Sequence, residues 1–143
     1  MSTARQIDQE YVTSGKVKLV FKNRAAIAQE SVWAAEAALC ASDQGKFWEY
    51  HDALYEALYA RNTSVYTQEG FRSLAADLSL EAEPFDACLE SGKYSDRVRE
   101  ESQESQDRGV TGTPTFFVND TKVVGAQPFA AFKAAIDAEL AKP

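Results

Sequence analysis

The sequence contains few of the residues on which metal and nucleophilic chemistry depends. Only two of its 143 residues are cysteine and one is histidine. Cys40 and Cys88 lie far apart in the chain, so there is no CxxC motif and no zinc-type cysteine spacing. A histidine-based metal cluster or a Ser-His-Asp triad would depend on His51 alone. We therefore expect neither a metal site nor a cofactor, and we assign no catalytic residue.

The sequence also lacks basic runs and long apolar runs. Its formal net charge of −7 and its pI near 4.7 would repel a phosphate backbone or an anionic membrane surface, so we expect no nucleic-acid partner. The longest apolar stretch, residues 32–41, is interrupted by Glu36 and is too short to cross a bilayer, so we expect no membrane insertion. The opening MSTARQIDQE has no apolar segment, which predicts no signal peptide and leaves the location of the protein open.

The residues that are present have the patterning of one mixed α/β domain, with 45% hydrophobic and 26% charged residues. Residues 16–21 (KVKLVF) alternate and then run apolar, which predicts a strand. Residues 115–118 and 122–124 predict a hairpin with a turn at Asn119-Asp120. Four helices are expected at residues 4–14, 29–41, 46–60 and 95–108, the first closed by Gly15 and the last capped by Ser95 and stopped by Gly109. Between 60 and 95 we expect two more, one capped by Thr67 and one that has Pro84 in its first turn and ends at Gly92. A final helix is expected to start near Pro128.

Apolar spacing within these helices predicts which side chains face the core. One face of residues 46–60 carries Phe47, His51, Leu54 and Leu58, and we expect a packed, hydrogen-bonded histidine there rather than a catalytic one. The acidic run at Glu100, Glu101 and Glu104 is interpreted as a solvated helix face. One aromatic set is interpreted as core and core rim rather than a peptide groove: Phe47, Trp48, Tyr50, Tyr55 and Tyr59. The last helix is expected to bury Phe129, Phe132, Ile136 and Leu140.

A loop of unusual composition precedes the expected hairpin. The stretch GVTGTPTFFVND runs from Gly109 to Asp120 and places Thr113-Pro114 directly before an aromatic, β-branched strand. Proline fixes its backbone φ angle and offers no N–H to a sheet. Because shaped loops on a rigid scaffold often carry function, we single out this one.

Several stretches together resemble the DsbA-like branch of the thioredoxin superfamily. They are GKVKLVF, ESVWAAEAALCASDQGKFWEYHDALYEA, FDACLESGKYSDRV, and GVTGTPTFFVND followed by VVGAQPF. In order they resemble the strand after the redox helix, the helical insertion, and the closing strand-hairpin-helix unit. The resemblance covers nearly the whole chain. It implies an α/β fold with a thioredoxin-like sheet, in which residues 1–143 form a partial domain with a large helical insertion at 22–108.

The resemblance also implies a substrate site and a missing partner for it. In this family the proline before the strand is cis and lies across from a CxxC, so we expect a cis Thr113-Pro114 bond. We also expect Thr113 and Pro114 to bind extended polypeptides through the unpaired Thr113 backbone. The family's CxxC and the strand before it would lie upstream of Met1 and are not in this sequence. Strands on either side of that place would show unpaired edges, which favour self-association.

The two cysteines leave alternatives open. Cys40 and Cys88 fall on two different expected helices, either as small buried hydrophobes or as a structural disulfide between the helices. The resemblance implies an extracytoplasmic protein, which favours the disulfide. The sequence does not give the distance between the two Cα atoms, which decides whether the bond can form. A catalytic role is disfavoured, because neither cysteine has a neighbouring basic group or a helix start to lower its pKa.

Three functions therefore remain open. The first hypothesis is that the chain is the C-terminal part of a thiol–disulfide oxidoreductase that acts on protein thiols and disulfides. In this hypothesis the sequence is truncated at its start and the chain is inactive alone. Alternatively, it is a redox-inactive module that binds extended peptides at the Thr113-Pro114 loop. The third hypothesis is a non-functional fragment that folds poorly by itself. For a full-length member, the family resemblance suggests a location in the cell envelope.

Overall fold

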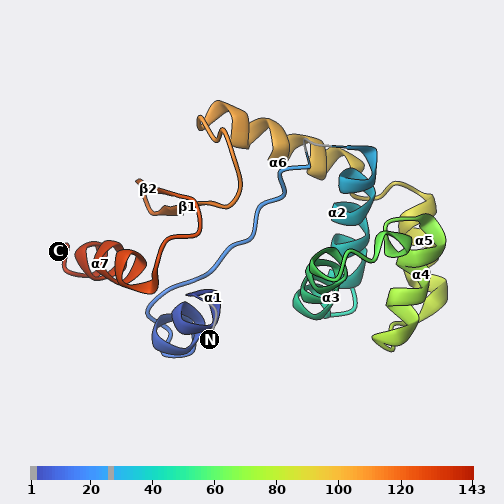
Figure 1. Ribbon diagram of the computed structural model, residues 1–143, viewed down its shortest axis with the longest axis horizontal. Helices are drawn as coiled ribbons and strands as arrows, with labels where there is room; N and C mark the ends of the chain where they lie inside the picture. Colours follow the sequence, from blue (N-terminus) through green and yellow to red (C-terminus); the bar gives the residue numbers. More distant parts are fainter. Residues whose placement is uncertain (1–2, 26–27) are drawn as a thin grey trace. The chain divides into compact units, whose positions relative to one another are not determined.

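The computed structural model describes residues 3–25 and 28–143, which divide into two compact units. The first unit combines the two ends of the chain, up to Lys22 and from Gln106 onward (Figure 1). The second unit is continuous, from Asn23 to Ser105. This division has a simple meaning: a helical segment is inserted between two parts of the chain that pack with each other.

The first unit contains the sheet. Its elements are α1 (Thr3–Ile7), the π-helical turn η1 (Asp8–Val12), β1 (Thr115–Val118), β2 (Thr121–Val124) and α7 (Phe129–Leu140). The strands β1 and β2 are antiparallel, with Val118 opposite Thr121 and Thr115 opposite Val124. Asn119 has a φ of 51°, so the two-residue turn uses a residue that tolerates the left-handed region. The predicted hairpin and its turn are confirmed.

The core of this unit lies between α1, α7 and one face of the hairpin. Phe132 and Ile136 of α7 are buried against Ile7 and Tyr11. The ring of Phe116 in β1 meets that of Phe132 edge to face, with centroids 4.7 Å apart. The burial predicted for Leu140 is wrong: the side chain is 47% exposed. It lies at the last position of α7, beyond the reach of the small core.

The strand predicted at residues 16–21 is also wrong. The segment lies in no helix or strand, and Leu19 and Val20 are 40% and 57% exposed. An extended segment becomes a strand only when a neighbouring strand accepts its N–H and C=O groups. Among the described residues the sheet contains β1 and β2 alone, so this segment has no strand to pair with.

The second unit is helical. Its elements are α2 (Gln29–Ser42), α3 (Phe47–Tyr59), the 3₁₀ turn η2 (Thr63–Val65), α4 (Gln68–Asp77), α5 (Ala82–Glu90) and most of α6 (Ser95–Asp107). No strand occurs in the described part of this unit, and the mixed α/β fold with a helical insertion agrees with the predicted fold class. The Thr67 hydroxyl accepts the Gly70 N–H at 3.0 Å, as the predicted cap requires. Gly70 is necessary here, because a Cβ atom would collide with the carbonyl oxygens of Ser64 and Val65.

Three large aromatic side chains form the centre of this unit. Tyr50, Phe71 and Phe85 are buried, and the Tyr50 hydroxyl donates to the Phe71 carbonyl at 2.9 Å. Burial raises the pKa of Tyr50. The prediction for the buried face of α3 is partly wrong, since Leu58 is 55% and Tyr59 81% exposed. The face centres on Tyr50 and Leu54 instead, the two residues of α3 that belong to the buried core cluster of this unit.

Two predictions for α6 need correction. Ser95 is itself the first helical residue, and its hydroxyl donates to Glu36 at 2.6 Å instead of capping α6. Glu101 is not solvated but only 5% exposed, because it lies one turn after the buried Val98 on the inner face of α6. Its carboxylate accepts the backbone N–H and the side-chain amide of Asn23 at 2.9 and 2.8 Å. The polar pattern of α6 therefore conceals a buried charged group.

Candidate functional site

The loop between α6 and β1 begins at a fixed point. Gly109 follows the helix with a φ of 66°, the left-handed conformation that commonly ends helices. Lys122, which extends from β2, donates from its Nζ to the Gly109 carbonyl oxygen. Gly109 is thereby attached to the hairpin, and the loop starts from that attachment.

The loop ends at Thr113-Pro114. The peptide bond between these two residues is cis, and both side chains are exposed. Pro114 accepts the Gly125 N–H at 2.8 Å, and the Thr115 hydroxyl donates to the Gly112 carbonyl at 2.7 Å. Across residues 3–25 and 28–143, no group pairs with the backbone N–H or C=O of Thr113. The loop therefore offers one free donor and one free acceptor on a fixed backbone.

The open edge of β1 continues this row of groups. In an antiparallel pair, alternate residues direct their N–H and C=O to the partner strand and away from it. The Gly125-to-Pro114 bond and the two-residue turn place Phe116 and Val118 on the β2 side. Thr115 and Phe117 consequently direct their backbone groups to the other edge, together with Thr113. Within the described chain, no strand lies along that edge.

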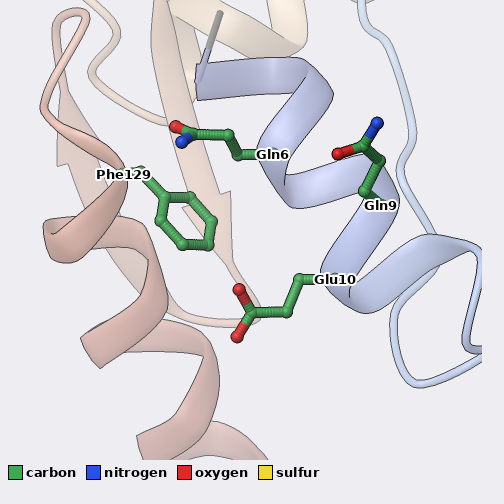
Figure 2. Close-up of a pocket in the computed structure, with 4 residues that line it drawn as sticks. All are labelled: Gln6, Gln9, Glu10 and Phe129. Carbon is green, nitrogen blue, oxygen red and sulfur yellow. The ribbon is translucent and has the colours of Figure 1, made fainter. Parts of the chain in front are cut away.

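The first turn of α1 lies near this loop. The Thr3 hydroxyl donates to the Gln127 carbonyl at 3.5 Å. Gln127 lies two residues after Gly125, whose N–H donates to the Pro114 carbonyl in the loop. Further along the same helix, a cavity of about 300 Å³ opens between α1, η1 and α7 (Figure 2). Its lining residues are Gln6, Gln9, Glu10 and Phe129. Sequence reasoning did not single out this cavity, because its residues are ordinary helix residues.

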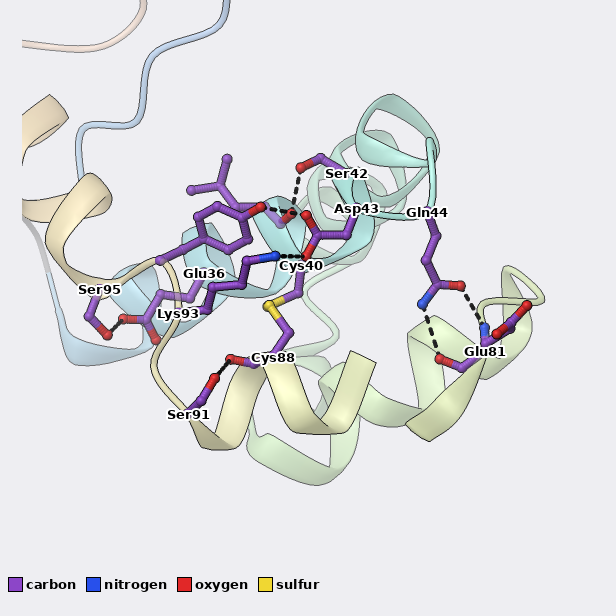
Figure 3. The surroundings of a disulfide bond; sticks show 12 residues. Glu36, Cys40, Ser42, Asp43, Gln44, Glu81, Cys88, Ser91, Lys93 and Ser95 are labelled. Carbon is purple, nitrogen blue, oxygen red and sulfur yellow. Dashed lines mark hydrogen bonds and ion pairs between the residues drawn. A yellow bond between two sulfur atoms is a disulfide. The ribbon is translucent and has the colours of Figure 1, made fainter. Parts of the chain in front are cut away.

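Cys40 and Cys88 are joined in a disulfide, with a Cα–Cα distance of 5.8 Å, between α2 and α5 (Figure 3). The two residues are only 1% and 6% exposed. Of the two alternatives, the structure therefore contains the structural disulfide between the helices and not two free buried thiols. Nearby, Asp43 accepts hydrogen bonds from Lys93 and Tyr94, which lower the pKa of its carboxyl group.

His51 is packed among aromatic rings. Its ring centroid lies 4.7 Å from that of Tyr55 and 5.5 Å from that of Trp48, and its Nδ1 lies 3.0 Å from an Asp52 carboxylate oxygen. This surrounding agrees with the predicted packed, hydrogen-bonded histidine. No group of three histidine, cysteine or acidic side chains in the described residues is arranged to hold a metal ion. No described helix is long and apolar enough to cross a membrane.

Comparison with known families decides the family question. The sequence model of the thioredoxin family matches residues 2–138. The chain belongs to the thioredoxin family. The match spans both compact units, so the family fold includes the inserted helices as well as the sheet.

Individual relatives agree with this assignment. The chain is 30% identical over 141 residues to the probable disulfide bond formation protein D of Bacillus anthracis, covering 96% of the chain and 64% of that protein. It is 33% identical over 108 residues to a Na(+)/H(+) antiporter NhaA 1 of Salinispora arenicola, covering 76% of the chain and 16% of that protein. The crystal structure of oxidised BdbD from Bacillus subtilis superposes with a TM-score of 0.75 at 22% identity, covering 95% of the chain and 75% of that structure. The fold is therefore DsbA-like, and the chain spans just under two thirds of the length of its Bacillus relative.

Proposed function

We propose that this chain is the substrate-binding part of a thiol–disulfide oxidoreductase that acts on protein thiols and disulfides. The observation that carries the proposal is the unpaired Thr113 backbone at the end of β1. An extended polypeptide added to this edge gains main-chain hydrogen bonds: Thr113 donates its N–H to a carbonyl of the polypeptide and accepts an N–H at its own carbonyl oxygen. The similarity to disulfide bond formation protein D also supports the proposal of a thiol–disulfide oxidoreductase.

The redox step requires groups that this sequence does not contain. A thiolate attacks one sulfur of a disulfide to give a mixed disulfide, and a second, resolving thiol then releases the product. The only two cysteines of the chain are already bonded to each other in the interior of the second unit. We propose that a CxxC upstream of Met1 supplies the reactive pair in the complete protein. The first turn of α1, close to the Thr113-Pro114 loop, is where such a motif would connect.

A redox-inactive peptide-binding module is the second candidate. It is favoured by one observation, namely that β1 has an open edge within the described residues while the sequence has no CxxC. The same edge also supports our proposal that isolated chains self-associate, because unpaired strand edges pair with other chains. Sedimentation velocity at increasing protein concentration measures this association.

The binding function is tested with a thiol-blocked probe. We expect the 143-residue chain to bind carboxamidomethylated insulin B chain, an unfolded polypeptide without free thiols, in a fluorescence anisotropy titration. Thr113→Pro removes the N–H proposed to donate to the polypeptide and is expected to weaken binding about 5- to 10-fold, because a hydrogen bond contributes roughly 1 kcal/mol. Thr111→Pro, two residues earlier in the loop, is the matched control and is expected to bind like the parent.

Absence of binding, or equal loss in both variants, would contradict the proposed site. Equal binding with and without reductant is expected from both candidate functions, because the probe has no thiols. The two candidates are separated by the upstream reading frame: an in-frame CxxC before Met1 supports the oxidoreductase, and in-frame stop codons support the binding module.

The disulfide supports a proposal on location. Disulfides form and persist mainly in oxidising compartments such as the periplasm or the cell exterior. We therefore propose that the mature protein works in the cell envelope or outside the cell. Trapping of thiols in intact cells is expected to find Cys40 and Cys88 blocked until reductant is added.

A further inference from the structure

We propose that Lys122 is a positioning residue for the Thr113-Pro114 loop and thereby sets its affinity for extended polypeptides. This inference rests on the proposed function, because the loop is the proposed substrate site. Lys122 lies on β2, eight positions after the cis-bonded proline, and nothing in the sequence pattern singles it out.

The ammonium group of Lys122 contacts the chain where it leaves α6. Its Nζ donates to the carbonyl oxygen of Gly109 and, at 3.5 Å, to that of Arg108. Arg108 directly follows the last residue of α6, where carbonyl groups have no partner within the helix and carry partial negative charge, which favours a cation. Lys122 therefore fixes the start of the loop to the hairpin.

An aromatic ring lies beside the same attachment. Phe117 is directly opposite Lys122 across the hairpin. The Arg108 guanidinium lies 3.6 Å and the Lys122 ammonium 5.9 Å from the centre of the Phe117 ring, both within the range of cation–π interactions. Arg108, β1 and β2 thus meet at Phe117, where the two cations hold the chain that follows α6 against the strands.

The other end of the loop is fixed independently. The Pro114 carbonyl accepts a hydrogen bond from the Gly125 N–H, and the Gly112 carbonyl accepts one from the Thr115 hydroxyl. Residues 110 and 111 lie between the Lys122 attachment and the Gly112 bond, and Thr113 lies between Gly112 and Pro114. Loss of the attachment is therefore expected to loosen residues 110–112 from one end while the hairpin stays paired. Thr113 follows directly and becomes more mobile, which costs binding free energy when a polypeptide orders it.

Three variants of the 143-residue chain test this inference. Lys122→Met keeps the length of the side chain but removes the N–H donors and the charge, and Lys122→Arg keeps both. Lys142→Met is the matched control, since Lys142 pairs with Glu139 at the end of α7. Two readouts are needed: ¹⁵N order parameters for residues 110–113, and the Kd for carboxamidomethylated insulin B chain.

We expect Lys122→Met to lower the order parameters of residues 110–113 from about 0.85 toward 0.6. We expect its Kd to rise about two- to fivefold, the size of a lost cation contact at a helix end. Lys122→Arg and Lys142→Met are expected to match the parent chain in both readouts. Unchanged loop order in Lys122→Met, or lowered order with an unchanged Kd, overturns the inference. If the parent chain binds no peptide, the proposed function fails, and the order parameters alone decide whether Lys122 positions the loop.

Discussion

The Glu101 carboxylate shows how a single buried charge holds the inserted unit together. It accepts two hydrogen bonds from Asn23, where the chain enters the unit, and one from Arg97 at 3.0 Å. Burial raises the pKa of the Glu101 carboxyl group, but the bonds from Asn23 and Arg97 more than offset this effect and leave the pKa below its ordinary value of 4.5. The charged form is therefore the stable one in the folded protein.

Replacement of this carboxylate should destabilise the fold. We expect Glu101→Gln to lower the free energy of unfolding at pH 7 by about 1–3 kcal/mol, because charge-assisted hydrogen bonds are lost in the interior. The stabilisation is present above pH 4.5, the ordinary value, and is lost as the pH falls through the lower folded-state pKa. Urea denaturation between pH 7 and pH 3 measures this, and the difference between the parent and the variant should narrow at the acid end.

The neighbouring Glu100 provides the control. Its side chain is exposed on the same helix, so Glu100→Gln is expected to change stability by less than about 0.5 kcal/mol. An equal loss in the two variants, or a Glu101→Gln effect that does not depend on pH, would contradict a buried and charged Glu101.

At the scale of secondary-structure elements, the disulfide connects two helices whose own sequences do not fix their contact. α2 is rich in alanine and presents small side chains such as Ala37 and Ala41, both fully buried, to the helices around it. Small side chains permit close packing but bury little apolar area each. The bond from Cys40 to Cys88 adds a covalent constraint at this contact with α5.

Loss of the disulfide should lower stability substantially. We expect the double variant Cys40→Ala/Cys88→Ala to lose about 2–4 kcal/mol, because the bond restricts a long segment of the unfolded chain. Guanidinium denaturation with and without dithiothreitol measures the effect. Reductant should lower the midpoint of the parent chain and leave the double variant unchanged. Equal midpoints for the parent and the double variant would show that α2 and α5 are held by packing alone.

At the scale of the whole molecule, the chain has the fold of its family but no reactive dithiol. The sheet unit carries the loop and its open edge, and the inserted unit carries the only two cysteines. These cysteines are buried and bonded, so neither is a thiolate that a substrate can reach.

We accordingly predict that residues 1–143 show no thiol–disulfide oxidoreductase activity above background. Insulin reduction by dithiothreitol, followed by turbidity, is the measurement, and the Cys40→Ala/Cys88→Ala variant should give the same background rate. A protein extended by an upstream strand and CxxC helix should accelerate the reaction. Turnover by the 143-residue chain that disappears in the double variant would instead place the active site at Cys40 and Cys88.

Local pattern determined much of this protein. The hairpin at 115–124, the helix ends at Gly92 and Gly109, and the Thr67 cap follow from short-range rules of turns and caps, because each depends on residues only a few positions apart. The family and its fold class were also accessible, since the order of several motifs carries more information than any one of them. The Thr113-Pro114 loop was found in this way.

The tertiary structure alone decided the features that depend on distant partners. Residues 16–21 have the composition of a strand, but a strand requires a neighbour, and none lies beside them in the described chain. The sequence around Glu101 is that of a solvated helix face, but in the fold its carboxylate is hydrogen-bonded to the backbone and side-chain amides of Asn23, 78 positions away. Whether Cys40 and Cys88 bond, and whether Lys122 reaches the end of α6, are likewise questions of Cα separation and side-chain reach. Such distances are set by the packing of whole elements, which no local stretch of sequence encodes.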